Sequence, residues 1–305
     1  MRIIKLLFVL FACSIKLPAQ ITTNDLTNLT GYYFGQKPPG AKPEVFAPDI
    51  LNRKMGYHSS IVFSPDLTFA LWCPMDNNNS KLLCSRMIDG KWTKLKWTNF
   101  GVEQGIFDPT FSPNGNKIFF LSFCPDKDGK NNRKRLWYVE KTEDGWSKAQ
   151  LIDEVVYDHP THWPCSVAKN GNLYFTSEIN GNSKQDIYVS FFDNGKYLPP
   201  ITMGSEINGN LNDFAPYIAP DESYLIFTRL DNYNGTCDLY ISFKKERIGW
   251  TKAINMGPKV NSEFVDLAPY VSPDGKYLFF ISQRERMNGI MWMSAEIINE
   301  LKRKN

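Results

Sequence analysis

Hydrophobic and polar positions along the chain follow a hairpin pattern that recurs five times. Residues 265–282 show it best: an apolar run reaches Ser272-Pro273-Asp274-Gly275, whose proline and glycine favour a turn, and a second apolar run follows. The second position of each turn marks the repeats, at Pro65, Pro113, Lys169, Pro220 and Pro273. The repeats are spaced by about 50 residues, the length of a propeller blade.

Each of the first four repeats continues with two further strands. Third strands are expected at 81–87, 135–140, 186–191 and 238–243, and fourth strands are each led by an aromatic residue, Trp92, Trp146, Tyr197 or Trp250. The fifth repeat has a third strand at 290–294, but after it the apolar residues have the spacing of a helix and no fourth strand follows. Residues 43–48, bracketed by prolines, are the one strand left over. The pattern therefore predicts an all-β protein, a β-propeller of five four-stranded blades closed by this N-terminal strand, with a six-bladed ring as the alternative.

The ends of the chain set the expected domain limits. A basic start and an apolar core of about ten residues are typical of a signal peptide, residues 1–19, with cleavage after Ala19. We expect an extended N-terminal arm at 20–42, the propeller at 43–297 and a C-terminal tail at 298–305. The protein is then exported, periplasmic or secreted, without a transmembrane span once the signal is removed. The alternative is a lipoprotein anchored through Cys13.

Charge and cysteine content narrow the partners. Lys and Arg number 35 against 32 Asp and Glu, and Arg2, Lys5 and Lys16 lie in the leader, so the mature chain is nearly neutral and nucleic acid is not an expected partner. We expect a monomer. Cys73 and Cys84 flank a hairpin tip; either a cross-strand disulfide or buried free thiols fits the sequence.

Candidate site residues gather just before the first strand of each repeat. His58, Ile106, His162, Asp213 and Asp266 stand seven residues before the turn marker, and Asp108 follows two residues after Ile106. The loops entering the inner strands converge on one face of a propeller, so we expect His58, Asp108, His162, Asp213 and Asp266 to bind a ligand at the channel mouth. Imidazoles and carboxylates also suit a metal or acid–base chemistry. The alternative for the aspartates is a structural role, accepting backbone hydrogen bonds in the loops.

Three segments carry a family resemblance. SPDGKYLFF (272–280), NDFAPYIAPD (212–221) and DIYVS (186–190) resemble the WD-repeat-like, TolB-type β-propeller repeat of exported bacterial proteins. The third repeat departs from it, with Ala168-Lys169 in place of Ser-Pro, and the first has Leu67 where glycine belongs. The resemblance implies a cell-envelope propeller that acts as a noncatalytic binding platform.

Its partner would be an envelope protein or a glycan or peptide ligand. The alternative is an extracellular hydrolase or lyase on polysaccharide or peptide, with its site at the mouth of the central channel. The sequence contains no Gly-x-Ser-x-Gly elbow and no His-Glu-x-x-His motif, so no catalytic residue and no cofactor are assigned. Whether the protein binds a metal ion is left open.

Overall fold

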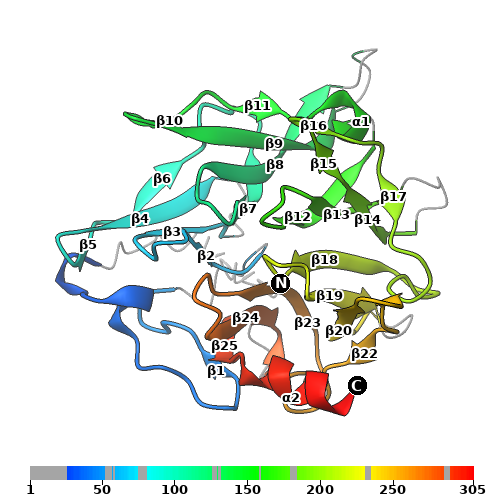
Figure 1. The fold of residues 1–305 in the computed structure, drawn as a ribbon. Coiled ribbons are helices and arrows are strands. Elements are labelled where there is room, and N and C mark those ends of the chain that lie inside the picture. Colours follow the sequence, from blue (N-terminus) through cyan, green and yellow to red (C-terminus); the bar gives the residue numbers. More distant parts are fainter. Residues whose placement is uncertain are drawn as a thin grey trace, which may run out of the picture.

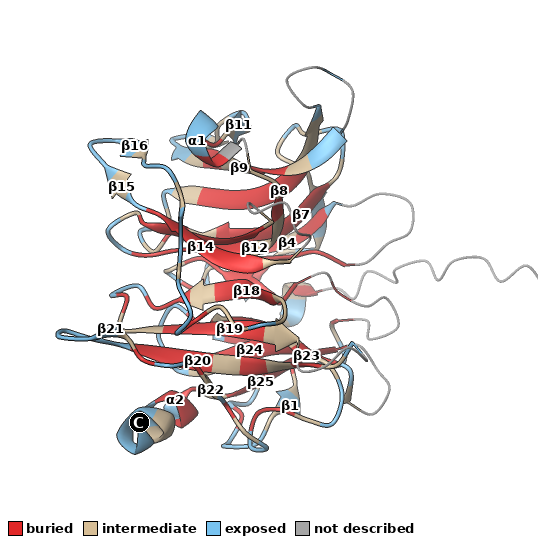
Figure 2. Ribbon diagram, turned by 90° about the vertical axis from the view of Figure 1, so that its right-hand side faces the viewer, coloured by how far each residue is buried: buried red, intermediate tan, exposed pale blue. Residues whose placement is uncertain are grey.

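The computed structural model describes residues 26–51, 57, 59–74, 81–125, 129, 132–157, 159–178, 184–230, 235–284 and 289–305. Their strands form five antiparallel sheets of four or five strands, set around a common centre like the blades of a propeller, and one separate two-stranded hairpin (Figure 1). This confirms the five-bladed ring predicted from the repeat. Figure 2 shows the buried residues concentrated along the strands, with exposed residues at many of the hairpin ends and over much of the C-terminal helix.

Each blade is a meander that begins with its innermost strand. Blade 1 holds β2 (Val62–Phe63), β3 (Phe69–Trp72), β4 (Leu82–Ile88), β5 (Lys91–Trp92) and β6 (Lys96–Thr98). Blade 2 holds β7 (Ile106–Phe111), β8 (Lys117–Pro125), β9 (Asn132–Thr142), β10 (Gly145–Trp146) and β11 (Gln150–Leu151). Blade 3 holds β12 (Thr161–Val167), β13 (Leu173–Ser177), β14 (Asp186–Ser190) and β17 (Ile201–Thr202), with a separate hairpin of β15 (Phe192–Asp193) and β16 (Lys196–Tyr197).

The remaining elements complete the ring. Blade 4 holds β18 (Asp213–Ile218), β19 (Tyr224–Leu230), β20 (Cys237–Lys245), β21 (Gly249–Trp250) and β22 (Ile254–Asn255). Blade 5 holds β23 (Asp266–Val271), β24 (Tyr277–Ser282), β25 (Gly289–Ser294) and β1 (Glu44–Val45). Among the described residues, four short helices lie outside the sheets, η1 (Leu26–Asn28), η2 (Tyr32–Gly35), α1 (Glu154–Tyr157) and α2 (Glu296–Lys304). In blades 1, 2 and 4 the outer strand is divided in two. The chain pairs first with the last residues of the third strand and then with residues nearer its start.

The N-terminal strand closes the ring as predicted. In β1, Glu44 pairs with Trp292 and Val45 with Met291 of β25, in antiparallel register. The amide of Phe46 extends the ladder by donating to the carbonyl oxygen of Ile290 at 2.8 Å. The outer edge of blade 5 is thereby covered, which removes a row of unpaired backbone groups.

The segment before β1 differs from the extended arm that the sequence predicts. Its 3₁₀ turns lie in the seam between blades 5 and 1, and Phe34 is completely buried there. The ring of Phe34 lies 4.6 Å from that of Trp92, and the hydroxyl of Tyr33 donates to Asp274 at 2.8 Å. Burial of these aromatic rings explains the difference, since an extended arm would leave them in water.

The predicted C-terminal tail also packs on the propeller. Residues 296–304 form α2, whose Ile297 and Ile298 are buried in the apolar cluster of blades 4 and 5. Lys259 and Glu300 pair at 2.6 Å across this contact. The helical spacing seen in the sequence therefore gives a helix with one face on the sheets.

The five cysteines within the described residues are free thiols. Cys84 pairs in register with Leu71, so its position is diagonal to Cys73 and not opposite to it. Diagonal neighbours in a sheet are about 7–8 Å apart, beyond the usual Cα separation of a disulfide. The register therefore favours the free thiols of the two alternatives that the sequence left open.

The turn of blade 3 shows why Lys169 replaces the proline of the other repeats. The Lys169 amide donates a hydrogen bond to the carbonyl oxygen of Pro220, in the turn of blade 4, at 2.8 Å. Proline has no amide hydrogen and could not make this contact. Lys169→Pro restores the repeat residue, yet we expect it to lower the free energy of unfolding by about 1–2 kcal/mol. Urea unfolding should show this loss, while Lys169→Met, which keeps the amide, should unfold like the unmodified protein.

Candidate functional site

The inner strands of blades 2 to 5 share a bulge near their starts. The residue in the bulge has a positive φ, at Asp108 (52°), Trp163 (63°), Ala215 (50°) and Ala268 (52°), and proline follows each one. Such angles are unusual for residues with a Cβ and cost about 1–3 kcal/mol each. Threonine hydroxyls of the preceding blade hold two of the bulge amides, Thr176 for Ala215 at 3.0 Å and Thr228 for Ala268 at 3.1 Å. The bulge is therefore a feature shared between neighbouring blades.

Blade 3 has one more residue in its bulge than the other blades. The register shifts between His162 and Ser166 there, but between Leu267 and Tyr270 in blade 5. As a result Thr161, and not His162, occupies the position of Asp213 and Asp266. The predicted equivalence was wrong by one residue at His162, because spacing from the turn cannot reveal an insertion inside the strand. The distance from the bulge proline to the turn, one residue longer at Pro164, was the available signal.

The bulge prolines narrow the central channel. A cavity of about 20 Å³ lies between the inner strands of the five blades. Pro109, Pro164, Pro216 and Pro269 are among its walls. Such a volume is enough for about one water molecule. The centre of the propeller is therefore packed with side chains at this level.

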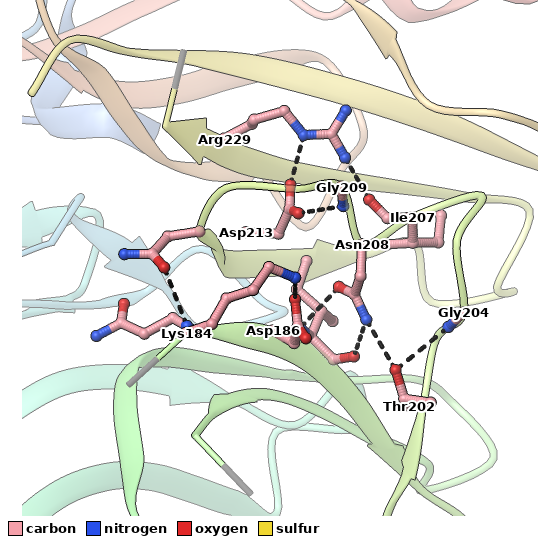
Figure 3. Close-up of polar contacts among 12 residues, drawn as sticks. Lys184, Asp186, Thr202, Gly204, Ile207, Asn208, Gly209, Asp213 and Arg229 are labelled. Carbon is pink, nitrogen blue, oxygen red and sulfur yellow. Dashed lines mark hydrogen bonds and ion pairs between the residues drawn. The ribbon is translucent and has the colours of Figure 1, made fainter. Parts of the chain in front are cut away.

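Asp213 is held in a buried ion pair (Figure 3). Its carboxylate is completely buried; Oδ1 accepts from Nε of Arg229 at 2.6 Å and Oδ2 from the amide of Gly209 at 2.6 Å. Arg229 also donates to the carbonyl oxygen of Ile207, in the same loop. Burial raises the pKa of Asp213, and Arg229 acts in the opposite direction. Both carboxylate oxygens are used to close the loop that leads into β18.

Asp266 repeats this arrangement in blade 5. Its carboxylate, also completely buried, accepts from the amide and the hydroxyl of Ser262 at 2.6 and 2.7 Å, and from Arg284 at 2.9 Å. Arg284 donates in turn to the carbonyl oxygen of Val260 at 2.7 Å. These are the hydrogen bonds of the structural role that the sequence offered as the alternative for the aspartates.

Asp108 lies in the bulge of blade 2 and is only 2% exposed. It is close to two buried thiols, Cys73 and Cys165, whose pKa values are raised by burial and further by the charge of Asp108. His58, the remaining candidate, lies outside the described residues. The structure thus brings Asp108 near cysteines, while Asp213 and Asp266 each bind their own loop and arginine.

His162 belongs to a connected set of side chains at the start of blade 3. Its Nε2 lies 3.5 Å from Oε1 of Glu178, and Glu178 accepts from Gln185 at 3.3 Å. Gln185 accepts in turn from the indole nitrogen of Trp163 at 2.8 Å. Lys134, whose ammonium group lies 4.4 Å from the centre of the Phe107 ring, repels the protonated form of His162. We call Lys134, His162, Trp163, Glu178 and Gln185 the loop-face cluster.

Sequence reasoning found only His162 of this cluster. Trp163 stands in the bulge and stacks on Phe214 of blade 4, with ring centres 4.6 Å apart and planes at 28°. All five members are partly exposed. The cluster therefore offers an aromatic surface, hydrogen-bonding groups and charges of both signs on one part of the loop face, the side on which the inner strands begin.

The pKa of His162 gives the cluster a measurable pH dependence. Burial lowers this pKa, Glu178 raises it and Lys134 lowers it, with a net decrease below the ordinary 6.5. The unfolded chain therefore takes up the proton more readily, and stability must fall as the pH decreases from about 6.5 through the lower folded pKa. We expect the melting temperature to fall less between pH 7 and pH 5 in His162→Gln than in the unmodified protein. Identical pH profiles of the two proteins would contradict this.

Two kinds of feature are absent from the described residues. Among them, no group of three or more histidine, cysteine, aspartate or glutamate side chains is arranged to hold a metal ion. No helix in this part of the chain is long and apolar enough to cross a membrane.

No protein-family model matches the chain, and no curated protein is similar to it in sequence. Similar solved structures include an endo-arabinase from Bacteroides thetaiotaomicron, with a TM-score of 0.52, 10% identity and coverage of 79% of this chain and 94% of that one. Hydrazine synthase from Kuenenia stuttgartiensis has a TM-score of 0.50 at 13% identity, over 76% of this chain and 36% of that one. TolB from Acinetobacter baumannii has a TM-score of 0.48 at 13% identity, over 76% and 53%. The chain spans about half the length of that TolB, and likeness at such identities concerns the fold alone.

Proposed function

We propose that the protein is a noncatalytic binding platform of the cell envelope, and that its loop face receives a protein, peptide or glycan. The observation that carries the proposal is the loop-face cluster. Trp163 is held by Gln185 at one edge and by stacking on Phe214, so its ring is fixed before any partner arrives. A fixed aromatic ring surrounded by hydrogen-bonding groups binds at a low entropic cost.

The carboxylates favour binding over catalysis. A glycosidase needs two carboxyl groups that face its substrate at a suitable separation. The oxygens of Asp213 and Asp266 instead accept hydrogen bonds from their loops and from Arg229 and Arg284, at full burial. The cavity of about 20 Å³ in the channel also leaves no room for a sugar ring at that level.

Site-specific crosslinking in producing cells tests the platform. A photoreactive phenylalanine analogue at Arg133, the exposed neighbour of Lys134 on β9, should capture a discrete partner. The same analogue at Ile248, which is 66% exposed in the β20–β21 turn, serves as the matched control and should capture none. Equal amounts of crosslinked product from the two positions, or none from Arg133, would contradict binding through the cluster.

The competing hypothesis, that the protein is a hydrolase or lyase, is tested on the purified protein. Polysaccharides and peptides are incubated with it and the release of products is measured. Turnover that disappears in Asp108→Asn, with unchanged thermal unfolding, would replace the platform with an enzyme. Asp108 is chosen because it is the candidate carboxylate that lies in an inner-strand bulge, in blade 2.

The proposed location has its own test. Export with cleavage after Ala19 predicts a mature protein that begins at Gln20. Mass spectrometry of the N-terminal peptide from the producing cell should find Gln20 first. An acylated Cys13 would instead place the propeller on a membrane surface through a lipid anchor.

A further inference from the structure

The five hairpin turns enclose a pocket on the face opposite the loop-face cluster, which we call the turn-face pocket. It has a volume of about 300 Å³. The marker residue of every repeat lines it, Pro65, Pro113, Lys169, Pro220 and Pro273. The last residue of each inner strand lines it as well, Phe63, Phe111, Val167, Ile218 and Val271. Ten positions that are equivalent in the repeat therefore converge around one space.

The floor of the turn-face pocket is formed by residues that it shares with the cavity of about 20 Å³ in the channel. Thr110, Ser166, Tyr217 and Tyr270 line both this pocket and the narrow cavity of the channel. Tyr270 is fixed there by hydrogen bonds with both the amide and the carbonyl oxygen of Phe63, each at 3.1 Å. Its ring packs edge to face on that of Tyr217, with centres 6.0 Å apart. The pocket is thus a preformed concavity and not a passage through the ring.

Most of the wall is apolar, and one charge stands on it. Lys169 is the only charged side chain among the residues that line the pocket. It is exposed, and it forms no ion pair with any residue that the structure describes. Its backbone is fixed by the hydrogen bond to Pro220, so the start of the side chain is held at the rim. An apolar concavity with one cation at its rim is complementary to an apolar molecule with one negative charge.

The aspartates of the neighbouring turns do not cancel this charge. Each accepts a hydrogen bond from the amide two residues further on in its own turn. These bonds are Thr68 to Asp66 at 3.1 Å, Ser223 to Asp221 at 3.0 Å and Lys276 to Asp274 at 3.2 Å. A lysine attracts each of the three carboxylates, Lys141, Lys302 and Lys276 respectively. In the turns of blades 2 and 3 the same position is the neutral Asn114 or Asn170. On the blade 2 side of Lys169 the rim therefore carries no carboxylate from these turns. On the blade 4 side, Glu222 follows Asp221, and its carboxylate is bound by Asn172, Tyr174 and Lys244 at 2.7–2.9 Å.

We propose that the turn-face pocket binds a small apolar monocarboxylate, with its hydrocarbon body between the proline rings and its carboxylate on Lys169. A volume of about 300 Å³ lies at the lower end of the range for ligand pockets, which limits the body to about one aromatic ring and a short chain. The contact is charge-assisted but exposed to solvent, so its energy is a fraction of that of a buried pair.

The probes are 3-phenylpropionate and its neutral counterpart 3-phenylpropan-1-ol, measured by isothermal titration and ligand-observed NMR on the full chain. We expect the acid to bind with a Kd of about 0.1–1 mM, as befits so small a ligand, and about fivefold more tightly than the alcohol. Lys169→Met should lower the affinity for the acid to that for the alcohol and leave the affinity for the alcohol unchanged. Lys94→Met, an exposed lysine between β5 and β6, is the matched control and should change neither.

A second variant tests the place of binding. Thr110→Tyr introduces into blade 2 the residue that blades 4 and 5 carry at the equivalent position, Tyr217 and Tyr270, so the fold should accept it. The added ring fills the floor, and both probes should lose binding. Amide hydrogen exchange of the unmodified protein should also slow at residues 111–114 when the acid is added.

Four results would overturn the proposal. The first is equal affinity of the unmodified protein for acid and alcohol. The second is an unchanged affinity for the acid in Lys169→Met. The third is the absence of binding at 10 mM probe by a protein whose unfolding curve shows that it is folded. Binding that persists in folded Thr110→Tyr would place the site elsewhere and would overturn it too.

Discussion

Replacing Phe34 with alanine is expected to lower the free energy of unfolding by about 3–5 kcal/mol. Phe34 is completely buried in the seam where blades 5 and 1 meet. Its ring lies 4.6 Å from Trp92, 5.9 Å from Phe63 and 6.1 Å from Trp72, measured between ring centres. The substitution removes the contacts of all three rings at once and leaves a cavity that rigid sheets cannot fill.

Tyr32 provides the matched control for Phe34. It precedes Tyr33 in the same 3₁₀ turn, but its side chain is 56% exposed. Tyr32→Ala should therefore change the free energy of unfolding by less than about 0.5 kcal/mol. Urea titrations followed by tryptophan fluorescence measure both variants. A loss below 1 kcal/mol for Phe34→Ala would show that the seam does not depend on the segment before β1.

The second large effect is expected at the buried pair of blade 4. Arg229→Met leaves the carboxylate of Asp213 buried without its cation, which should cost about 3–5 kcal/mol. Asp213 is completely buried, so water cannot replace the lost partner. The exposed pair of Lys117 and Glu140, at 3.1 Å, is the control, and Glu140→Gln should cost less than about 1 kcal/mol. Chemical unfolding of the two variants at pH 8 makes the comparison.

The loss of unfolding free energy caused by Arg229→Met should become smaller as the pH is lowered. Burial raises the pKa of Asp213 above its unfolded value, and Arg229 lowers it, so removal of Arg229 raises it further. A carboxyl group with a raised folded pKa is most favourable to the fold below its unfolded pKa, and that advantage is lost as the pH rises through the folded pKa. The variant should therefore recover part of its stability between pH 8 and pH 5. A penalty that does not change with pH would indicate that Asp213 is not the group left unpaired.

The ring could be predicted from the sequence because its signals are local and repeated. Proline and glycine mark each turn, and the proline-bracketed segment 43–48 was the only strand without a place, so closure followed by elimination. The packing of Phe34 could not be predicted in this way. Its neighbour Tyr32 is equally aromatic but exposed, and only the three-dimensional structure shows that Tyr33 and Phe34 enter the seam while Tyr32 does not.

The candidate site could be predicted in part, because two of its residues recur with the repeat. Asp213 and Asp266 recur at one position of the repeat, which suggested both a ligand site and a structural role. Their partners Arg229 and Arg284 stand on or just after the next strand, and pairing them requires the register of the hairpin. Trp163 was overlooked because its importance depends on an extra bulge residue, which shifts the side chains of blade 3 by one position.

The closure of the ring also sets an order of events during folding. Glu44 and Val45 find their partners only in Trp292 and Met291, and Tyr33 reaches Asp274, which is 241 positions away. A chain that emerges with its N-terminus first must hold the strand β1 unpaired until the whole ring has followed. Contacts of such long range are formed slowly, because a long loop must close before they stabilise anything. We expect the seam to be the last part of the propeller to become protected, and the stage before its closure to be the one most exposed to aggregation through the free edge of blade 5.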